Sequence, residues 1–155
     1  MPADREYNFT IRVRKILAHA RAEAERCGHA TMSPEHVVLG LIEDGGGVAF
    51  AILENHGMST EALRRDVEAS LPLTAPEHST LRDLPWTPVA KNVLMRAMTE
   101  ARELRHSYVG TEHLLLALVH DPHLPVAKLL AQYGLLRETA MAETLRLLGP
   151  MPPSH

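Results

Sequence analysis

The stretch EHVVLGLI at residues 35–42 is followed 77 residues later by EHLLLALV at residues 112–119. Each begins with Glu-His and continues as an apolar run, and the same offset brings many other residues into register without a gap. The matched pairs include Thr10 with Thr87, Leu17 with Leu94, Glu23 with Glu100, His29 with His106, Leu53 with Leu130, Gly57 with Gly134 and Leu71 with Leu148. A fixed period held over most of the chain indicates duplication of one supersecondary unit.

The first helix of each repeat is predicted from its cap and its apolar spacing. Thr10 stands where an N-cap belongs, and apolar residues follow it at 3.6-residue intervals. Thr87 occupies the same place in the second repeat, with Pro88 at the first helical position. The apolar runs that follow each of these helices are hydrophobic nearly all round, which is typical of buried central helices.

The remaining helices complete two similar halves. The central helices are expected to begin at the caps Ser33 and Thr111. Third and fourth helices are expected over about residues 48–56, 59–71, 126–133 and 136–148. No segment alternates with period two for long enough to form a strand. The sequence therefore predicts an all-α fold of eight helices. They are arranged as two tandem, pseudo-twofold-related four-helix repeats at residues 8–71 and 86–149. A linker is expected at residues 72–85 and a disordered tail at residues 150–155.

The composition narrows the class of protein. A chain of 155 residues, 45% of them hydrophobic, has enough apolar surface for the core of one compact domain. Its 16 basic and 19 acidic residues give a net charge of −3, which argues against nucleic-acid binding. The longest apolar run, residues 114–119, is far shorter than the ~18 residues that cross a bilayer. We therefore expect a cytoplasmic protein that binds neither nucleic acid nor membrane.

Several strings carry a resemblance to a known family. They are Phe9-Thr10, AERCGH at 24–29 and the run at 35–42 in the first repeat, and WTP at 86–88, EAREL at 100–104 and HSYVGTEHLLL at 106–116 in the second. Over residues 8–149 the chain resembles the N-terminal, or Clp repeat, domain of the Clp ATPases, and the last string is particularly close to the ClpC type. The resemblance implies the all-α fold of that domain, acting by binding.

The chain lacks the phosphate loop of the ATPase modules that follow this domain in the Clp ATPases. Its glycine run at 45–47 is followed by Val48 and Ala49, with no Lys-Ser or Lys-Thr. No ATPase activity is therefore expected of this chain, which looks like a free-standing domain or a part of a longer protein.

The resemblance implies two pockets for phosphoarginine, a mark on proteins sent for degradation. The matching residues are Thr10 with Glu35, and Thr87 with Glu112. A helix N-terminus with a hydroxyl would receive the phosphate, and a carboxylate would pair with the guanidinium. The alternative is that the threonines are simple caps and the glutamates only favour the helix dipole. The second pocket is expected to be the more complete, because Pro34 removes a backbone donor near the first.

Two aromatic residues precede the capped helices at matching positions, Phe9 and Trp86. They are interpreted as hydrophobic staples that hold each helix entry, with an apolar floor for a bound peptide as the alternative. His36 and His113 are expected to be structural, and His120 with His123 lacks a third ligand at recognisable spacing, so no metal or cofactor is expected. No nucleophile recurs beside the Glu-His pairs, so we do not expect an enzyme.

These observations favour a protein-interaction module that recognises substrates or adaptors for Clp-dependent proteolysis. Its expected partners are a Clp ATPase, adaptor proteins and substrates, including proteins that bear phosphoarginine. The alternative is a stand-alone decoy or sequestering protein that holds cyclic peptides or small molecules without a Clp partner. An enzyme acting on phosphorylated side chains has the least support.

Overall fold

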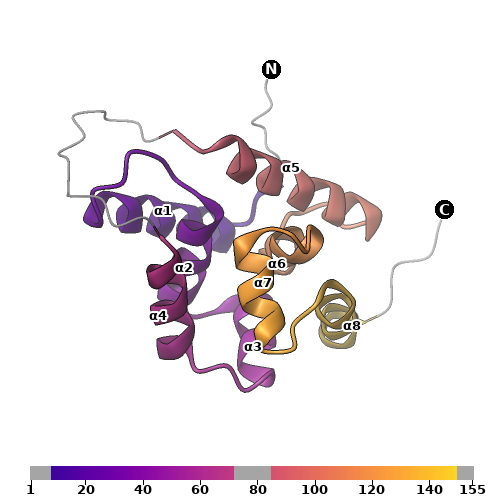
Figure 1. Ribbon diagram of the computed structural model, residues 1–155. Coiled ribbons are helices and arrows are strands. Elements are labelled where there is room, and N and C mark those ends of the chain that lie inside the picture. Colours follow the sequence, from indigo (N-terminus) through magenta and orange to yellow (C-terminus); the bar gives the residue numbers. More distant parts are fainter. Residues whose placement is uncertain (1–7, 72–84, 150–155) are drawn as a thin grey trace.

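The computed structural model describes residues 8–71 and 85–149, most of which are helical (Figure 1). Within these ranges, extended backbone pairs only at two isolated bridges. The all-α expectation is confirmed; the linker up to residue 84 and the tail at 150–155 lie outside the described residues. The eight helices that these residues form are α1 (Ile11–Arg26), α2 (Pro34–Asp44), α3 (Gly47–Asn55), α4 (Thr60–Ser70), α5 (Pro88–Glu103), α6 (Thr111–His120), α7 (Pro125–Gln132) and α8 (Arg137–Leu148).

The first helix of each repeat starts as expected. The Thr10 hydroxyl accepts a hydrogen bond from the backbone N–H of Val13 at 3.1 Å, and the Thr87 hydroxyl accepts one from Ala90 at 3.0 Å. Each cap satisfies one of the donors that a helix start leaves unpaired. The two helices therefore have equivalent N-termini, except that Pro88 gives α5 one N–H fewer.

The start of α6 differs from the expectation. Gly110 is the N-cap, and Thr111 is already the first helical residue. The Thr111 hydroxyl instead accepts a hydrogen bond from the backbone N–H of Ala49 at 3.0 Å, across from the first repeat. The side chain that caps α6 is His113, whose Nδ1 accepts from the Gly110 N–H at 2.8 Å. The Thr111 hydroxyl therefore bonds to a residue distant in sequence, and not to the first turn of its own helix as an N-cap would.

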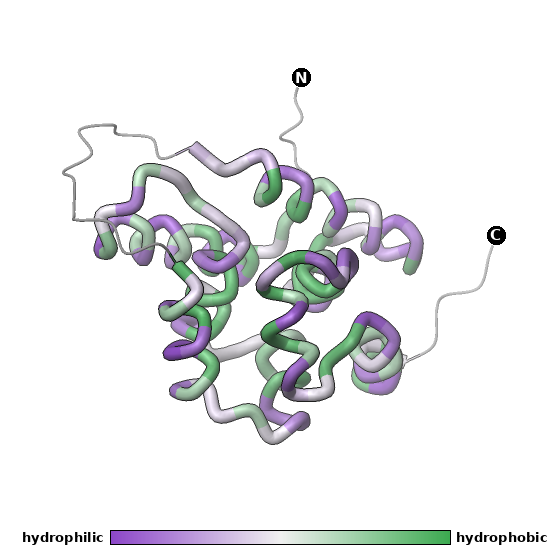
Figure 2. The backbone as a smooth tube through the Cα atoms, in the orientation of Figure 1, coloured by the Kyte–Doolittle hydropathy of each residue, from purple (hydrophilic) through white to green (hydrophobic). Residues whose placement is uncertain are grey.

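One hydrophobic core runs through both repeats. Its centre is formed by α2, buried from His36 to Leu41, and by α6, buried from Thr111 to Val119, as their apolar sequences predict. The α3 helix of the first repeat contacts α6 and α8 of the second, and α4 contacts α7, so the two repeats pack against each other. Along α1 and α5, hydrophobic and hydrophilic residues alternate turn by turn, as Figure 2 shows. These outer helices are therefore one-sided, with one face on the core.

Sharp bends return the chain to the core after each central helix. The axes of α2 and α3 meet at 88°, and those of α6 and α7 at 101°. In the part of the chain that the structure describes, no single helix is long and apolar enough to span a membrane, and only these bent pairs, taken together, meet that length and composition.

The hairpin of α1 and α2 is packed closely at Gly40. A methyl group on Gly40 would lie 2.4 Å from the carbonyl oxygen of Ile16 and 2.9 Å from the backbone nitrogen of Ala20. The two helices run antiparallel, since Arg12 at the start of α1 forms a 2.7 Å ion pair with Asp44 at the end of α2. Only glycine permits so close an approach of the two backbones.

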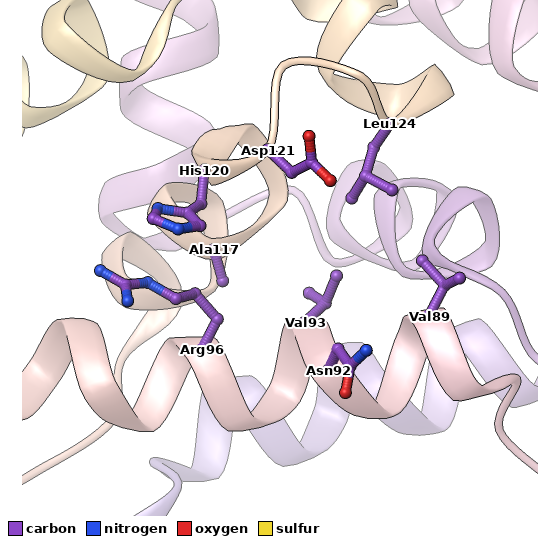
Figure 3. Close-up of a pocket in the computed structure, with 8 residues that line it drawn as sticks. All are labelled: Val89, Asn92, Val93, Arg96, Ala117, His120, Asp121 and Leu124. Carbon is purple, nitrogen blue, oxygen red and sulfur yellow. The ribbon is translucent and has the colours of Figure 1, made fainter.

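The equivalent position in the second repeat is Ala117, and there the hairpin is more open. A cavity of about 310 Å³ lies between the first half of α5 and the end of α6 (Figure 3). It is lined by Val89, Asn92, Val93, Arg96, Ala117, His120, Asp121 and Leu124. Residues from the start of α5 and from the end of α6 line the same cavity. The α5–α6 hairpin is therefore antiparallel, like the α1–α2 hairpin.

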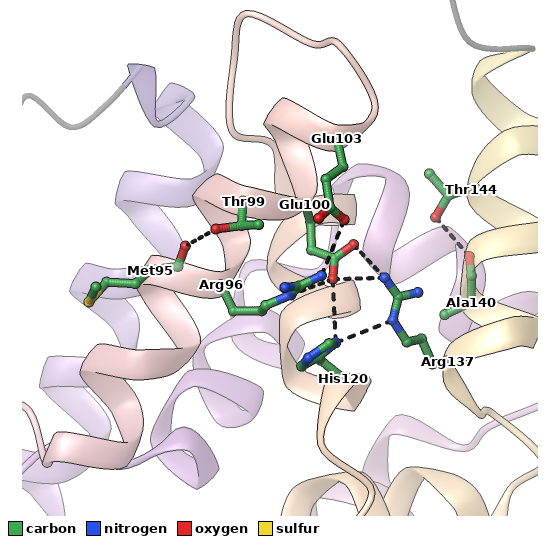
Figure 4. Close-up of polar contacts among 9 residues, drawn as sticks. All are labelled: Met95, Arg96, Thr99, Glu100, Glu103, His120, Arg137, Ala140 and Thr144. Atoms are coloured by element: carbon green, nitrogen blue, oxygen red, sulfur yellow. Dashed lines mark hydrogen bonds and ion pairs between the residues drawn. The ribbon is translucent and has the colours of Figure 1, made fainter.

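A buried carboxylate joins three helices of the second repeat. The Glu100 side chain on α5 is fully buried, and it accepts hydrogen bonds from Arg96 at 2.8 Å and from Arg137 of α8 at 3.0 Å. His120 at the end of α6 lies 3.7 Å from the same carboxylate, and Figure 4 shows the three side chains converging on it. In the first repeat Glu23 holds the matching place and pairs with Arg26 and Arg64.

Candidate ligand-binding site

The two repeats exchange short segments just before their helices. The N–H of Thr10 donates to the Val109 carbonyl at 3.1 Å, and the N–H of Val109 donates to Asn8 at 2.9 Å. In the same way, Thr87 donates to Met32 and Met32 donates to Pro85, both at 2.9 Å. The segment before each capped helix therefore pairs with the segment before the central helix of the other repeat.

This crossed pairing corrects the expected combination of site residues. Thr10 and Glu35 belong to opposite ends of the antiparallel α1–α2 hairpin, because Arg12 near the start of α1 reaches Asp44 at the end of α2. A 16-residue helix separates its ends by about 24 Å. Thr10 lies instead beside the segment that leads to Glu112, and Thr87 beside the one that leads to Glu35. We refer to the α1–Glu112 site (Thr10 and Glu112) and the α5–Glu35 site (Thr87 and Glu35).

Phe9 and Trp86 take part in the same crossing. A hydrophobic staple would pack them on the fourth residue of the following helix, but those residues are the polar Arg14 and Lys91. Phe9 instead forms its bridge with Val109, and Trp86 forms its bridge with Met32. Both rings are half-buried against the core, at the places where the two repeats pair.

The helix N-termini supply donors for an anion. In α1 the Thr10 hydroxyl takes the N–H of Val13, while the N–H groups of Ile11 and Arg12 have no acceptor among the described residues. In α5 the first helical residue is Pro88, and the backbone N–H of Val89 has no acceptor within residues 8–71 and 85–149. Both helices have 16 residues, and their dipoles favour negative charge at these ends.

The two glutamates have different surroundings. Glu112 is only 3% exposed. Burial, followed by its electrostatic interaction with Glu112, raises the pKa of Tyr108 to about 12. Glu35 is half-buried, and none of the described residues forms a hydrogen bond or ion pair with its side chain. Of the two carboxylates, Glu35 is the more exposed.

A pair of hydrogen-bonded histidines stands at the start of each central helix, next to its glutamate. His113 Nδ1 accepts the Gly110 N–H at 2.8 Å, and its Nε2 lies 2.8 Å from His106 Nδ1. A backbone N–H only donates, so the neutral His113 ring carries its proton on Nε2 and donates it to His106. The first repeat has the same arrangement in His36 and His29, with both distances 2.9 Å. The expected structural role of His36 and His113 is thus capping.

Sequence reasoning missed one cluster of possible metal ligands. Its members become neighbours only because the segment at residues 107–111 turns back on itself. The ligand atoms of His106, Glu112 and His113 all lie within 4.8 Å of one another. A metal ion would need a lone pair on His113 Nε2, but that nitrogen is protonated and donates to His106. The arrangement therefore favours a hydrogen-bonded cluster over a metal centre.

Acid is expected to destabilise the fold through His36 and His113. Burial, with a smaller contribution from the neighbouring His29 and His106, lowers both pKa values to about 4 from 6.5. Below the unfolded pKa, the unfolded chain binds protons that the folded chain does not, so the free energy of unfolding falls from about pH 6.5 to about pH 4. Each group contributes up to about 1.4 kcal/mol per pH unit in that window. Urea unfolding at about pH 7 and about pH 5 measures this difference.

A variant with both buried histidines replaced by glutamine should show a flatter pH dependence than the wild type. His123, which is exposed, offers a matched control, since His123→Gln should leave the pH dependence unchanged. Equal urea midpoints for the wild type at the two pH values would contradict the prediction.

The fold is a helical module of two repeats whose segments cross before their helices. The family model of the Clp repeat (R) N-terminal domain matches residues 8–133, and the chain belongs to this family. Clp N-domains are interaction modules rather than catalytic domains, and they bind substrates and adaptors.

Relatives of known sequence include ClpC. The chain is 39% identical over 141 residues to the negative regulator of genetic competence ClpC/MecB of Bacillus subtilis, and 37% identical to the chaperone protein ClpB of Oceanobacillus iheyensis. Each match covers 91% of this chain but 17% of the relative, so the chain spans about a sixth of the length of these proteins.

Solved structures share the fold at lower identity. The Hsp104 N-terminal domain of Candida albicans matches with a TM-score of 0.75 at 20% identity, covering 92% of both chains. The N-terminal domain of the ClpD chaperone of Arabidopsis thaliana matches with a TM-score of 0.68 at 20% identity, covering 92% of this chain and 96% of that one.

Proposed function

We propose that this chain recognises protein substrates or adaptors for Clp-dependent proteolysis in the cytoplasm, and that its ligand is phosphoarginine on a marked protein. The observation that carries the proposal is the crossed pairing of the repeats. It places a threonine-capped helix N-terminus beside the segment bearing a glutamate, twice in one chain.

The chemistry of each site matches the two ends of phosphoarginine. The phosphate is an anion that unpaired N–H groups at a helix start would receive, assisted by the helix dipole. The guanidinium is a planar cation that pairs with a carboxylate through charge-assisted hydrogen bonds. Neither fragment of phosphoarginine can make both kinds of contact, since free phosphate lacks the guanidinium and arginine lacks the phosphate. A preference for the joined ligand over both fragments is the signature of this function.

Calorimetric titration with free phosphoarginine tests the proposal, with arginine and phosphate as separate controls. We expect saturable binding by the wild type and at least a tenfold loss, about 1.4 kcal/mol or more, in the Glu35→Ala/Glu112→Ala variant. The reason is that the guanidinium loses its charged partner while the anion donors remain.

The matched control is Glu61→Ala/Glu138→Ala. These glutamates are also 77 residues apart and stand in the first turns of α4 and α8, where both are exposed. Their removal changes the net charge equally and should leave the affinity unchanged. Absence of binding by the wild type at millimolar ligand, or equal loss in both double variants, would contradict the proposal.

A further inference from the structure

The first hairpin is closed at one end by an arginine side chain. Arg12 of α1 pairs with Asp44 at the end of α2, with Nη1 2.7 Å from the carboxylate oxygen. The same side chain covers the loop after α2, where a Cβ built on Gly47 would lie 2.7 Å from Arg12 Cδ. These contacts enclose the carboxylate, since the Asp44 side chain is only 7% exposed. A cation of the chain itself therefore fills this end of the first hairpin.

The second repeat keeps the aspartate of this pair and lacks its arginine. At the offset of 77 residues, Asp121 corresponds to Asp44, and Val89 corresponds to Arg12. Both Asp121 and Val89 line the cavity between α5 and α6, and Figure 3 shows the Asp121 carboxylate turned toward α5. Within residues 8–71 and 85–149, the Asp121 side chain forms no ion pair, and its one hydrogen bond comes from the backbone N–H of His123, at 2.9 Å to Oδ1. The second carboxylate oxygen has no partner in that part of the chain.

The arginine that lines this cavity does not take the place of Arg12. The Arg96 guanidinium is held by Glu100 at 2.8 Å and by Glu103 at 3.2 Å. In Figure 3 it lies on the side of the cavity away from Asp121. The charge of Asp121 is therefore left without the neighbour that neutralises Asp44.

The walls of the cavity suit the apolar stem of a long cationic side chain. Apolar residues from both helices and from the loop after α6 line it: Val89, Val93, Ala117 and Leu124. Ala117 keeps α5 and α6 apart, because the closer approach seen at Gly40 leaves no room for a methyl group. The volume of about 310 Å³ falls at the lower end of the ~300–1,000 Å³ typical of ligand pockets. An arginine side chain can lay its methylene groups on these walls and present its charge to Asp121.

We propose that this cavity binds an unmodified arginine side chain of a partner protein, whose guanidinium pairs with Asp121 as that of Arg12 pairs with Asp44. The site is separate from those of the proposed function, since Asp121 follows the end of α6 and Glu112 stands in its first turn. Phosphoarginine is disfavoured here, because its phosphate would meet the Asp121 carboxylate with like charge. The cavity would thus read a basic residue of the partner in addition to any phosphorylated one.

Titration of the isotope-labelled chain, followed by nuclear magnetic resonance at low ionic strength, tests the proposal. The probe is Nα-acetyl-arginine methylamide, and the control ligand is the matching citrulline compound, which has nearly the shape of arginine without its charge. We expect saturable shifts of the backbone amides of Val93, Ala117 and Asp121 with the arginine probe. The citrulline compound should bind about threefold more weakly or less. Equal affinities for the two compounds, or no saturable shift at these amides, would overturn the proposal.

Two variants remove the site in different ways. Asp121→Asn removes the charge at nearly constant size and should weaken binding of the arginine probe by about threefold or more. Val89→Arg introduces the residue of the first repeat, whose guanidinium should pair with Asp121, fill the cavity and exclude the probe. It should also raise the urea midpoint of unfolding, and Val89→Arg/Asp121→Asn should lose this gain. Circular dichroism confirms that each variant is folded.

Met95→Arg is the matched control for Val89→Arg. It adds the same charge to the same helix, but the Met95 side chain is 60% exposed and lies outside the cavity lining. The affinity for the arginine probe should stay within about twofold of the wild type. An equal loss in both arginine variants would mean that the added charge repels the probe from the whole surface, and would overturn the proposal.

Titration with phosphoarginine distinguishes this inference from the proposed function. Asp121→Asn should keep the affinity for phosphoarginine, and Glu35→Ala/Glu112→Ala should keep the affinity for the arginine probe, each within about twofold. Loss of the arginine probe in Glu35→Ala/Glu112→Ala, with binding retained in Asp121→Asn, would overturn the inference and leave the proposed function standing. Asp121-dependent binding of the arginine probe, with no binding of phosphoarginine, would support the inference and overturn the proposed function.

Discussion

Replacement of Glu100 by alanine is expected to lower the free energy of unfolding by about 3 kcal/mol or more. The carboxylate is fully buried and is the shared partner of Arg96 and Arg137, which lie on different helices. Without it, two guanidinium groups face each other across a cavity, and α8 loses its charged attachment to α5. A loss of this size is a large part of the stability of an ordinary domain, about 5–15 kcal/mol. Urea unfolding at neutral pH, followed by circular dichroism, measures it.

Glu103→Ala is the matched control for this prediction. Glu103 also pairs with Arg96, at 3.2 Å, but its side chain is 57% exposed. Exposed ion pairs contribute little because water screens them and the side chains lose entropy, so we expect less than about 0.5 kcal/mol. If Glu100→Ala costs no more than Glu103→Ala, the buried cluster does not hold the second repeat together in the way that we describe.

Replacement of Gly40 by alanine should also destabilise the fold, by about 2–3 kcal/mol. In an exposed helix interior this substitution is favourable by about 1 kcal/mol, because alanine has the higher helix propensity. Here the added methyl group would lie 2.4 Å from the carbonyl oxygen of Ile16. A backbone atom within a helix cannot move aside as a side chain does, so α1 and α2 must separate and lose packing along the hairpin. Thermal and urea unfolding measure the change.

The equivalent residue of α6, Ala117, supplies the comparison. It is buried beside a cavity, so Ala117→Gly should cost the difference in helix propensity and one buried methyl group, about 1–2 kcal/mol, without any steric clash. A stabilising effect of Gly40→Ala would mean that propensity governs this position and that the hairpin tolerates wider spacing.

The local structure was predictable from the sequence because its causes are local. Thr10 and Thr87 begin their helices as N-caps, since the hydroxyl that caps a helix belongs to the residue before it. The nearly continuous apolar runs at 35–42 and 112–119 form the buried centres of α2 and α6, since no other placement removes all their faces from water. The duplication and the helix positions followed from these patterns. The cap of α6 did not, because the Thr111 hydroxyl found a partner 62 residues away.

The candidate site depends on contacts that no sequence pattern records. The sequence by itself determined which residue types are present twice: a capping threonine, a glutamate in the first turn of the central helix, and a histidine directly after that glutamate. Only the tertiary structure decided which threonine lies beside the segment that leads to which glutamate, because the segments of the two repeats cross and pair by backbone hydrogen bonds that any side chains would allow. It also decided that Glu112 is buried while Glu35 is half-buried, with the Glu112 carboxylate in the space that a Cβ on Gly110 would need.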